Sequence, residues 1–194
     1  MDMHLDQLRV LVAAFSPLSD QEWDEFAGLW KPFSAGRKEI LTSAGEQEQY
    51  LYFVCEGVQR IYTLDHTSRE ATLVFTYPPS FGGAVDSLIL RQPSRYYYET
   101  LTPGVFLRAG YEGLSALAAK HPSVSALIMK GLAQALAGTL ERLSEVQSLS
   151  SEERYRVLLK RSPHLLQLVP HKYIASYLGI DPTNFSKLMN KVRI

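Results

Sequence analysis

The sequence contains a single cysteine, Cys55, among its 194 residues. One cysteine cannot form a disulfide within the chain, and it excludes an iron–sulfur cluster or a zinc ion held only by cysteines of one chain. Cys55 ends an apolar run that begins at Leu51, which favours a buried structural thiol. A redox switch is the alternative interpretation.

Long apolar runs are also absent. No stretch approaches the roughly 20 consecutive apolar residues that a membrane span needs, so we expect no membrane partner. The first twelve residues include Asp2, His4, Asp6 and Arg9, unlike the basic start and unbroken apolar core of a signal peptide. We therefore expect a cytoplasmic protein.

The sequence lacks a cluster of catalytic or metal-binding residues. No Ser/His/Asp order, phosphate loop or paired-carboxylate motif stands out. A cupin-type metal enzyme is the enzymatic alternative, and it needs clustered histidines with a nearby glutamate. The histidines here are scattered along the chain, at His4, His66, His121, His164 and His171. We therefore expect no enzyme, no catalytic or metal-binding residues and no certain cofactor.

An excess of either charge is absent as well, since 20 Lys or Arg balance 20 Asp or Glu. The distribution is uneven, however. Residues 151–194 hold eight bases and three acids, a net charge of +5, which leaves the first 150 residues at −5. An acidic body with a basic C-terminal segment fits a protein that contacts phosphates at one end only.

The pattern along the chain predicts helices first and a β-rich region next. Apolar spacing predicts a helix over residues 5–14, and Ser19 with Glu22 forms a capping box ahead of a second helix. Short β-rich runs then alternate with Gly, Pro and Asp turns, which indicates a sandwich, barrel or jelly roll. We expect strands at Glu39–Thr42, Leu51–Cys55, Gln59–Leu64, Ala71–Thr76, Tyr96–Leu101 and Val105–Arg108.

A long helix is predicted after the strands. A helix at Tyr111–Lys120 precedes a run without proline from about Ser123 to Leu149. Six of its positions recur at alternating spacings of three and four, which is typical of a coiled coil and favours a homodimer. The alternative is a helix that packs on its own sheet. The six positions are Met129, Leu132, Leu136, Thr139, Leu143 and Val146, and a second apolar set beside them is Val124, Leu127, Ile128 and Ala135.

We place a domain boundary near residue 150, where Ser150 and Glu153 have capping-box spacing. This divides the chain into a sensor domain over 1–149, which includes the long helix at 123–149, and a C-terminal domain over 150–194.

The last residues have the special positions of a helix-turn-helix. Ala175 is small enough for two helices to touch, and Gly179 suits a tight turn. Asp181 is an acidic cap followed by Pro182 at the first position of the second helix. Phe185 and the apolar Leu188, three residues on, are expected to return to the core.

Polar side chains occupy the other side of the second helix. Thr183, Asn184, Lys187 and Lys191 can all donate hydrogen bonds, as a reader of the DNA major groove requires. Ser186 and Lys172 are better placed for phosphates, so we predict that these six residues bind double-stranded DNA. An αα-hairpin with polar outer residues is the alternative.

The order of roll, long helix and helix-turn-helix resembles the Crp/Fnr superfamily over nearly the whole chain. Residues 45–57 match the family's G-x5-L-Y-x-[IV]-x-x-G hairpin, Phe81-Gly82-Gly83 matches the start of its phosphate-binding cassette, and Ser151–Arg154 matches its approach to the DNA-binding domain. The resemblance implies an α+β fold with a cyclic-nucleotide-binding-like β jelly roll, flanking helices, a dimerisation helix and an all-α helix-turn-helix domain. It also implies a transcriptional regulator that partners DNA and a second copy, with RNA polymerase as a further candidate.

The cassette departs from the family members that bind cyclic nucleotides. They place a Glu after the cassette glycine and an Arg ten residues later, but this chain has Ala84 and Ser94 there. Arg95 is one step along, which reverses the side-chain face in a strand. We expect no cyclic-AMP binding, and either an unidentified small-molecule effector in an aromatic pocket or a structural roll. By resemblance, the candidate ligand-facing residues are Gly83, Ala84, Ser94, Arg95, Tyr97 and Thr139. The run Tyr96-Tyr97-Tyr98 stands where the family usually has smaller residues, and it is bulky enough to fill the pocket.

Two features keep a second function open. Pro182 occupies a position that resembles the family's base readers, yet it has no side-chain hydrogen bond to give. The chain stops at Ile194, which leaves little room for an added wing. The alternative is a ligand-binding or protein-interaction module whose helix-turn-helix no longer reads DNA.

Overall fold

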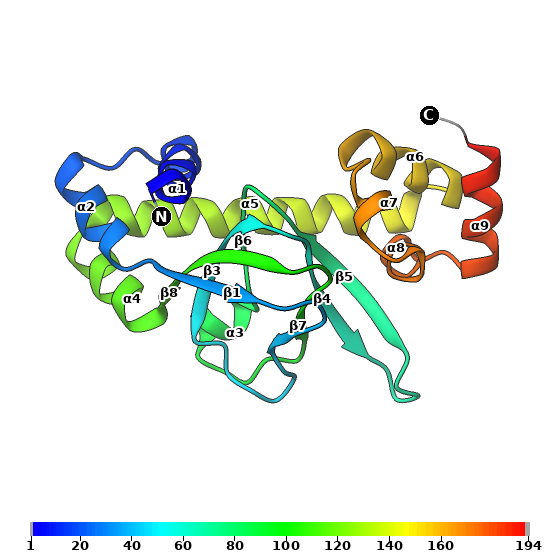
Figure 1. The fold of residues 1–194 in the computed structure, drawn as a ribbon, viewed down its shortest axis with the longest axis horizontal. Helices are drawn as coiled ribbons and strands as arrows, with labels where there is room; N and C mark the ends of the chain where they lie inside the picture. The colour runs from blue at the N-terminus through cyan, green and yellow to red at the C-terminus, as the bar shows by residue number, and fades with distance from the viewer. Residues whose placement is uncertain (1, 193–194) are drawn as a thin grey trace.

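The structure is a computed structural model that describes residues 2–192, so Ile194 lies outside the described residues. A two-sheet β roll, flanking helices, one long helix and a C-terminal group of short helices form the predicted α+β architecture (Figure 1). The helices are α1 (Asp2–Phe15), α2 (Asp20–Gly28), α3 (Val85–Leu90), α4 (Tyr111–Lys120), α5 (Pro122–Ser148), α6 (Ser151–Arg161), α7 (Leu165–Leu168), α8 (His171–Leu178) and α9 (Pro182–Lys191). The strands are β1 (Lys31–Ala35), β2 (Ile40–Thr42), β3 (Tyr50–Glu56), β4 (Gln59–Leu64), β5 (Glu70–Thr76), β6 (Ser80–Gly82), β7 (Tyr97–Thr100) and β8 (Gly104–Gly110).

The roll consists of two antiparallel four-stranded sheets, ordered β1-β8-β3-β6 and β2-β7-β4-β5. Side chains alternate between the two faces of a strand, and the inward faces bring together Tyr52, Val54, Tyr98 and Phe106. All six predicted strands are present. The sequence analysis did not predict β1, β6, α3 or α7.

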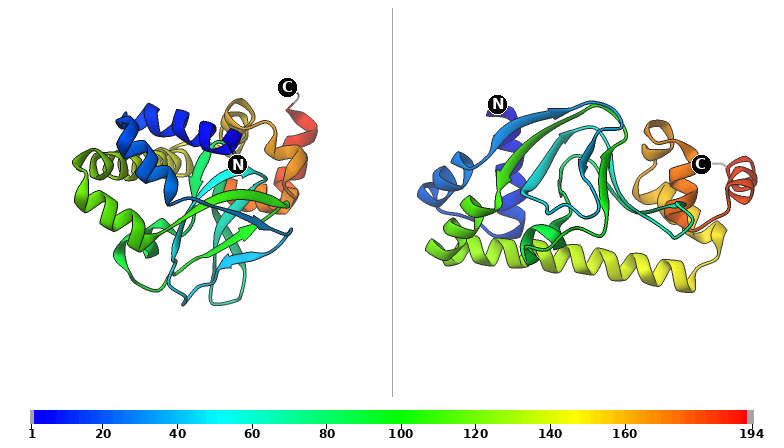
Figure 2. Two further views of the ribbon diagram at one scale, coloured as in Figure 1. Left: turned by 60° about the vertical axis from the view of Figure 1, so that its left-hand side comes forward. Right: turned by 90° about the horizontal axis from the view of Figure 1, so that it is seen from below.

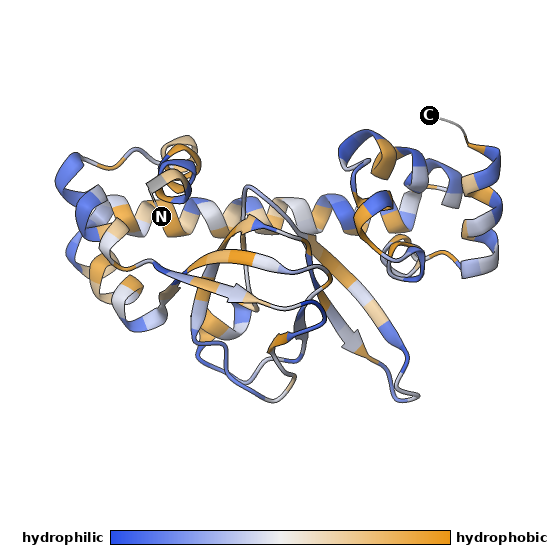
Figure 3. Ribbon diagram, in the orientation of Figure 1, coloured by the Kyte–Doolittle hydropathy of each residue, from blue (hydrophilic) through white to orange (hydrophobic). Residues whose placement is uncertain are grey.

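Helices cover the outer face of the first sheet. Phe53 and Leu107 point outward from β3 and β8 and pack in one apolar cluster with Leu8 of α1 and Phe26 of α2. The same cluster contains residues of α4 and of the first turns of α5. Figure 3 shows hydrophobic and hydrophilic residues alternating along these short helices.

The long helix α5 extends from the N-terminal helices to the C-terminal group (Figures 1 and 2). Val124 and Leu127, near its start, are its buried residues. Ile128 packs against the same cluster, and from Met129, which is 69% exposed, to Ser148 the helix contains no buried residue. Contrary to the expectation from apolar runs, α5 is long and apolar enough to cross a membrane, judged by length and composition alone. Of the apolar stretch of α5 that meets this criterion, 11% is buried.

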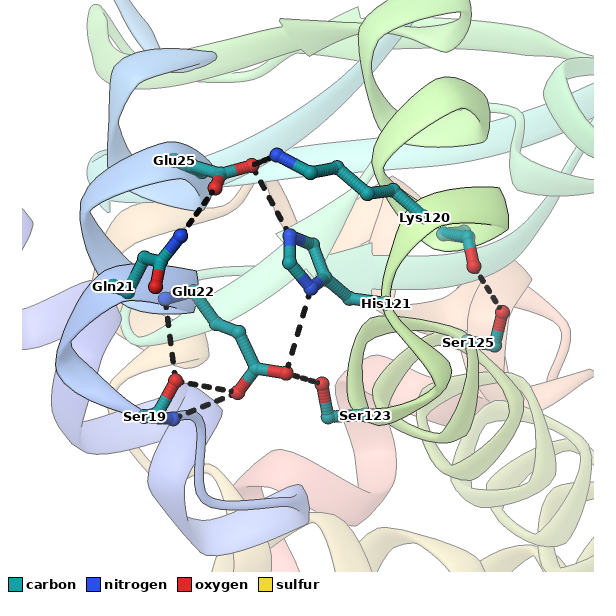
Figure 4. A network of polar contacts seen from close by, with 9 residues as sticks. Ser19, Gln21, Glu22, Glu25, Lys120, His121, Ser123 and Ser125 are labelled. Atoms are coloured by element: carbon teal, nitrogen blue, oxygen red, sulfur yellow. Dashed lines mark hydrogen bonds and ion pairs between the residues drawn. The ribbon is translucent and has the colours of Figure 1, made fainter.

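A polar network fastens α2 to the start of α5 (Figure 4). Lys120 Nζ donates to Glu25 Oε2 at 2.7 Å, and His121 Nε2 lies 3.1 Å from the same oxygen. Ser123 donates to Glu22, whose other oxygen accepts from the Ser19 backbone N–H in the predicted capping box. The hydrogen bonds from Lys120 and then His121 lower the pKa of Glu25 from 4.5 to about 2.

This pKa predicts that the attachment of α2 weakens in acid. A carboxyl group with a depressed pKa stabilises the folded chain above its ordinary pKa, and that contribution is lost as the pH falls from about 4.5 to about 2. We expect the fluorescence of Trp23, on α2, to report a change in this range. The Glu25→Gln variant should show a smaller fluorescence change between pH 4.5 and 2 than wild type does. Identical pH titrations of the two proteins would contradict the role of Glu25.

The C-terminal helices share a core with the roll. Tyr155, Ile174 and Phe185 belong to one buried cluster with Val58 and Phe75 of the roll. The break between α5 and α6 falls at residues 149–150, where we expect the domain boundary, but apolar packing continues across it.

Candidate DNA-reading surface and roll interior

A tight turn joins α8 to α9. Gly179 ends α8 with φ +62°, a left-handed conformation that glycine adopts without strain. The Asp181 side chain then accepts from the backbone N–H groups of Thr183 at 2.9 Å and Asn184 at 3.3 Å. These bonds satisfy two amides at the start of α9, and Pro182 has no amide to satisfy.

The inner side of α9 anchors it to α6 and α8. The Phe185 side chain is 1% exposed, and its ring meets the Tyr155 ring edge-on with centroids 5.4 Å apart. Ala175 is buried where α8 faces α9, and Leu188 is partly buried in the same cluster. Ala175, Phe185 and Leu188 therefore lie on the core side of the helix-turn-helix, as the sequence predicts.

The outer side of α9 is polar and exposed at Thr183, Asn184 and Lys187. The Ser186 hydroxyl donates its hydrogen to the Pro182 carbonyl, so this hydrogen is already used within the helix. Three candidate base readers are thus free on one side of α9, within the described part of the chain.

Two further predicted contacts already have partners within the chain. Lys191 Nζ lies 2.8 Å from Glu152 Oε2 of α6, and Lys191 with Arg156 lowers the pKa of Glu152 below its ordinary value. Lys172 is exposed, with its Nζ 4.6 Å from the centre of the Tyr173 ring. A phosphate at Lys191 would have to compete with the Glu152 carboxylate.

Tyr98 fills the centre of the roll. It is 0% exposed, its hydroxyl lies 3.2 Å from Thr76 Oγ1, and its ring packs on Tyr52. Burial raises the pKa of the Tyr98 hydroxyl. A Cβ at Gly82, in the cassette, would collide with that hydroxyl, so the tyrosine reaches the cassette backbone itself.

Glu48 closes the cassette from the adjacent loop. Its carboxylate is buried and accepts from the backbone N–H groups of Gln49 at 3.0 Å, Tyr50 at 3.1 Å and Ala84 at 3.3 Å, and from the Thr42 hydroxyl. Desolvation raises the pKa of Glu48 despite these donors. The Ala84 amide of the cassette therefore already has a carboxyl partner within the chain.

The other candidate ligand residues do not converge on one place. Ser94 is buried, and its hydroxyl bonds only to the backbone of Tyr96. Arg95 is exposed. The Thr139 hydroxyl, on an exposed part of α5, donates to the Ala135 carbonyl.

Tyr97 and Gly83 also lie apart from each other. Tyr97 is stacked on Tyr62, on the outer face of the second sheet. Gly83, with φ +112°, packs against the Tyr52 ring and the Tyr50 carbonyl.

One hollow lies at the mouth of the roll, where Arg108 is the basic residue. This cavity of about 320 Å³ is lined by Thr42, Glu48, Tyr52 and Arg108, among others. The Arg108 guanidinium lies 4.2 Å from the centre of the Phe33 ring and 4.3 Å from that of Tyr50. Sequence reasoning found neither Glu48 nor Arg108, because neither belongs to a local motif.

Cys55 is buried in the cluster between the first sheet and the helices. Burial raises the pKa of its thiol to about 11, so the reactive thiolate is scarce at neutral pH. Among residues 2–192, no group of three or more His, Cys, Asp or Glu side chains is arranged to hold a metal ion.

Comparison with known proteins gives consistent matches. The family model "Cyclic nucleotide-binding domain" matches residues 32–121. The global nitrogen regulator of Synechocystis sp. is 22% identical over 207 residues, which cover all of this chain and 89% of that protein.

Solved structures share the fold. FixK2 from Bradyrhizobium japonicum matches with a TM-score of 0.74 and 18% identity, over 84% of this chain and 83% of that one. The Thermus thermophilus catabolite activator protein matches with a TM-score of 0.57 and 22% identity, over 90% of this chain and 83% of that one. The chain therefore contains a cyclic nucleotide-binding domain over residues 32–121 and, over most of its length, shares the fold of FixK2 and of the catabolite activator protein.

Proposed function

We propose that this chain is a DNA-binding transcriptional regulator and not an enzyme. The observation that carries the proposal is the free polar row on α9, since Thr183, Asn184 and Lys187 are exposed while Phe185 holds the opposite side in the core. Lysine and asparagine at such positions match the hydrogen-bonding edges of guanine and adenine. Lys172, which is exposed, is the proposed phosphate contact beside the helix, whereas Ser186 would first have to release the Pro182 carbonyl. The regulator acts in the cytoplasm, where its DNA is.

The proposed active form is a dimer through α5. The residues that we name the α5 seam form one exposed stripe, and an additional exposed residue, Leu140, lies beside it. Outside this stripe α5 carries Lys130, Glu141, Arg142 and Glu145. A helix with one apolar stripe and charges outside it matches a second helix better than a lipid bilayer, which needs apolar residues all round. The α5 seam consists of Met129, Leu132, Leu136, Thr139, Leu143 and Val146.

We propose that the roll does not bind cyclic AMP. Tyr98 occupies the centre, Glu48 accepts from the Ala84 amide of the cassette, and Arg95 is exposed. A cyclic phosphate beside the Glu48 carboxylate would meet a like charge, and it would lack a basic partner on the cassette. If a small effector exists, the hollow beside Arg108 has the space for it.

The DNA-reading surface is tested by Lys187→Ala. We expect this change to weaken specific binding by about 1–3 kcal/mol, because it removes a base contact. The measurement is fluorescence anisotropy with a duplex from the gene's own upstream region, at fixed salt. Arg37→Ala is the matched control, since it removes one exposed positive charge from the roll. Equal affinity of the two variants for the duplex would favour the alternative function, a ligand-binding or protein-interaction module whose helix-turn-helix no longer reads DNA.

A further inference from the structure

The outer face of the second sheet carries a buried arginine. The Arg60 side chain on β4 is 1% exposed. Its Nη2 lies 2.7 Å from the carboxylates of Glu99 on β7 and Glu70 on β5, and Nη1 donates to Thr72 Oγ1 at 3.3 Å. The roll alone thus holds the guanidinium in a fixed position and balances its charge.

Aromatic rings enclose this guanidinium on both sides. Its central carbon lies 4.0 Å from the centre of the Tyr62 ring on β4 and 3.8 Å from that of Tyr173 on α8. The Tyr97 ring of β7 stacks on Tyr62, with centroids 5.0 Å apart and planes 16° apart. Tyr97, Tyr62, Arg60 and Tyr173 therefore form a continuous ladder from the roll to the first helix of the helix-turn-helix.

A second set of contacts joins α8 to the edge strand β5. The Thr72 backbone N–H donates to Ser176 Oγ at 3.0 Å, and that hydroxyl lies 3.3 Å from the Glu70 carbonyl. The Ser176 side chain thus takes the place of a neighbouring strand. Beside it, the Phe75 and Tyr177 rings pack with centroids 5.0 Å apart.

We propose that the Tyr97–Tyr62–Arg60–Tyr173 ladder is an intramolecular latch that holds α8 on the roll and sets the direction in which α9 presents its polar side. In the latched state Thr183, Asn184 and Lys187 remain exposed, so the latch positions the reading surface without covering it. Fixing this position in advance reduces the ordering cost of a later binding event.

The chemistry of the interface suits a latch. Arg60 keeps its two carboxylates and the Tyr62 ring when α8 leaves, so opening does not strand a buried charge. Opening forfeits the Tyr173 face, the Ser176 bonds and the apolar packing of α8 on Phe75. The inference concerns contacts within one chain and is independent of whether α9 reads DNA.

Native-state hydrogen exchange of the full chain tests the latch through one amide. Because the Thr72 N–H donates to Ser176, its exchange reports the release of α8, while Phe53 N–H in β3 reports the roll. Tyr173→Leu keeps an apolar side chain but removes the aromatic face. We expect this variant to raise Thr72 exchange about tenfold or more, with Phe53 unchanged.

The matched control is Tyr155→Leu, which removes a buried ring of the same C-terminal cluster that does not touch Arg60. It should leave Thr72 exchange within about threefold of wild type. Unchanged Thr72 exchange in Tyr173→Leu, or an equal rise in both variants, would overturn the latch. The double variant Arg60→Met with Glu99→Gln removes the cation and one of its carboxylate partners from the roll. The latch requires that this variant raise Thr72 amide exchange as much as Tyr173→Leu does.

Discussion

Leu136→Glu together with Leu143→Glu should convert the protein into a monomer. Both side chains are exposed on the α5 seam, seven residues apart. A dimer through this seam would bury four new carboxylates, each at a cost of several kcal/mol without a partner. We expect the dimer Kd to rise by at least about a thousandfold, since every 1.4 kcal/mol is a factor of ten. Analytical ultracentrifugation of both proteins measures this directly.

The control uses the adjacent positions on the same helix. Ala137 and Ser144 are also exposed and seven residues apart, but they lie one step outside the α5 seam. Ala137→Glu with Ser144→Glu adds the same charge and should leave the dimer largely intact. If wild type is monomeric, or if both double variants dissociate equally, the seam is not the dimer interface.

Tyr98→Ala should destabilise the roll by about 3–5 kcal/mol, the cost of removing a large ring from a packed core. The Tyr98 side chain has no exposure and contacts Tyr52, Thr76 and the cassette backbone at Gly82. Urea unfolding followed by circular dichroism gives the free energy of unfolding of each variant.

The neighbouring tyrosine supplies the comparison. Tyr96 is only half-buried, so Tyr96→Ala should cost about 1 kcal/mol or less. A small effect of Tyr98→Ala would mean that the interior adapts easily. The centre of the roll would then be available to an effector, contrary to the account given above.

The C-terminal elements were predictable because their signals are local. The Asp181 cap, the turn glycine Gly179 and the small Ala175 each specify a backbone position without help from distant residues. The same holds for the capping boxes at Ser19 and Ser150, both of which the structure contains.

The elements that were missed depend on the fold around them. The edge strand β1 contains Pro32, which demotes a strand prediction, but its pairing with β8 holds it in place. The strand β6 has three residues and ends on Gly82, too short for a periodic pattern. The helix α3 has no side-chain cap, and Arg91 ends it in the left-handed conformation.

The roll interior could be predicted only in kind. The tyrosines from Tyr96 to Tyr98 indicated aromatic side chains near the interior. The side that faces inward depends on strand register, and the structure places only Tyr98 of these three there. Glu48 and Arg60 were not predictable, because their partners lie up to 39 residues away in the sequence. Contacts between residues so far apart produce no recognisable motif or periodic spacing in the sequence.

The central claim is that the exposed side of α9 reads a DNA sequence, and selection from a pool of random duplexes tests it most directly. The wild-type chain should enrich one motif made of two inverted half-sites with centres about 10 base pairs apart, or a multiple of that spacing, as a symmetric dimer requires. Its affinity for that motif should fall steeply with salt. A pool that is not enriched for any motif, with equal affinity for all duplexes, would contradict the account.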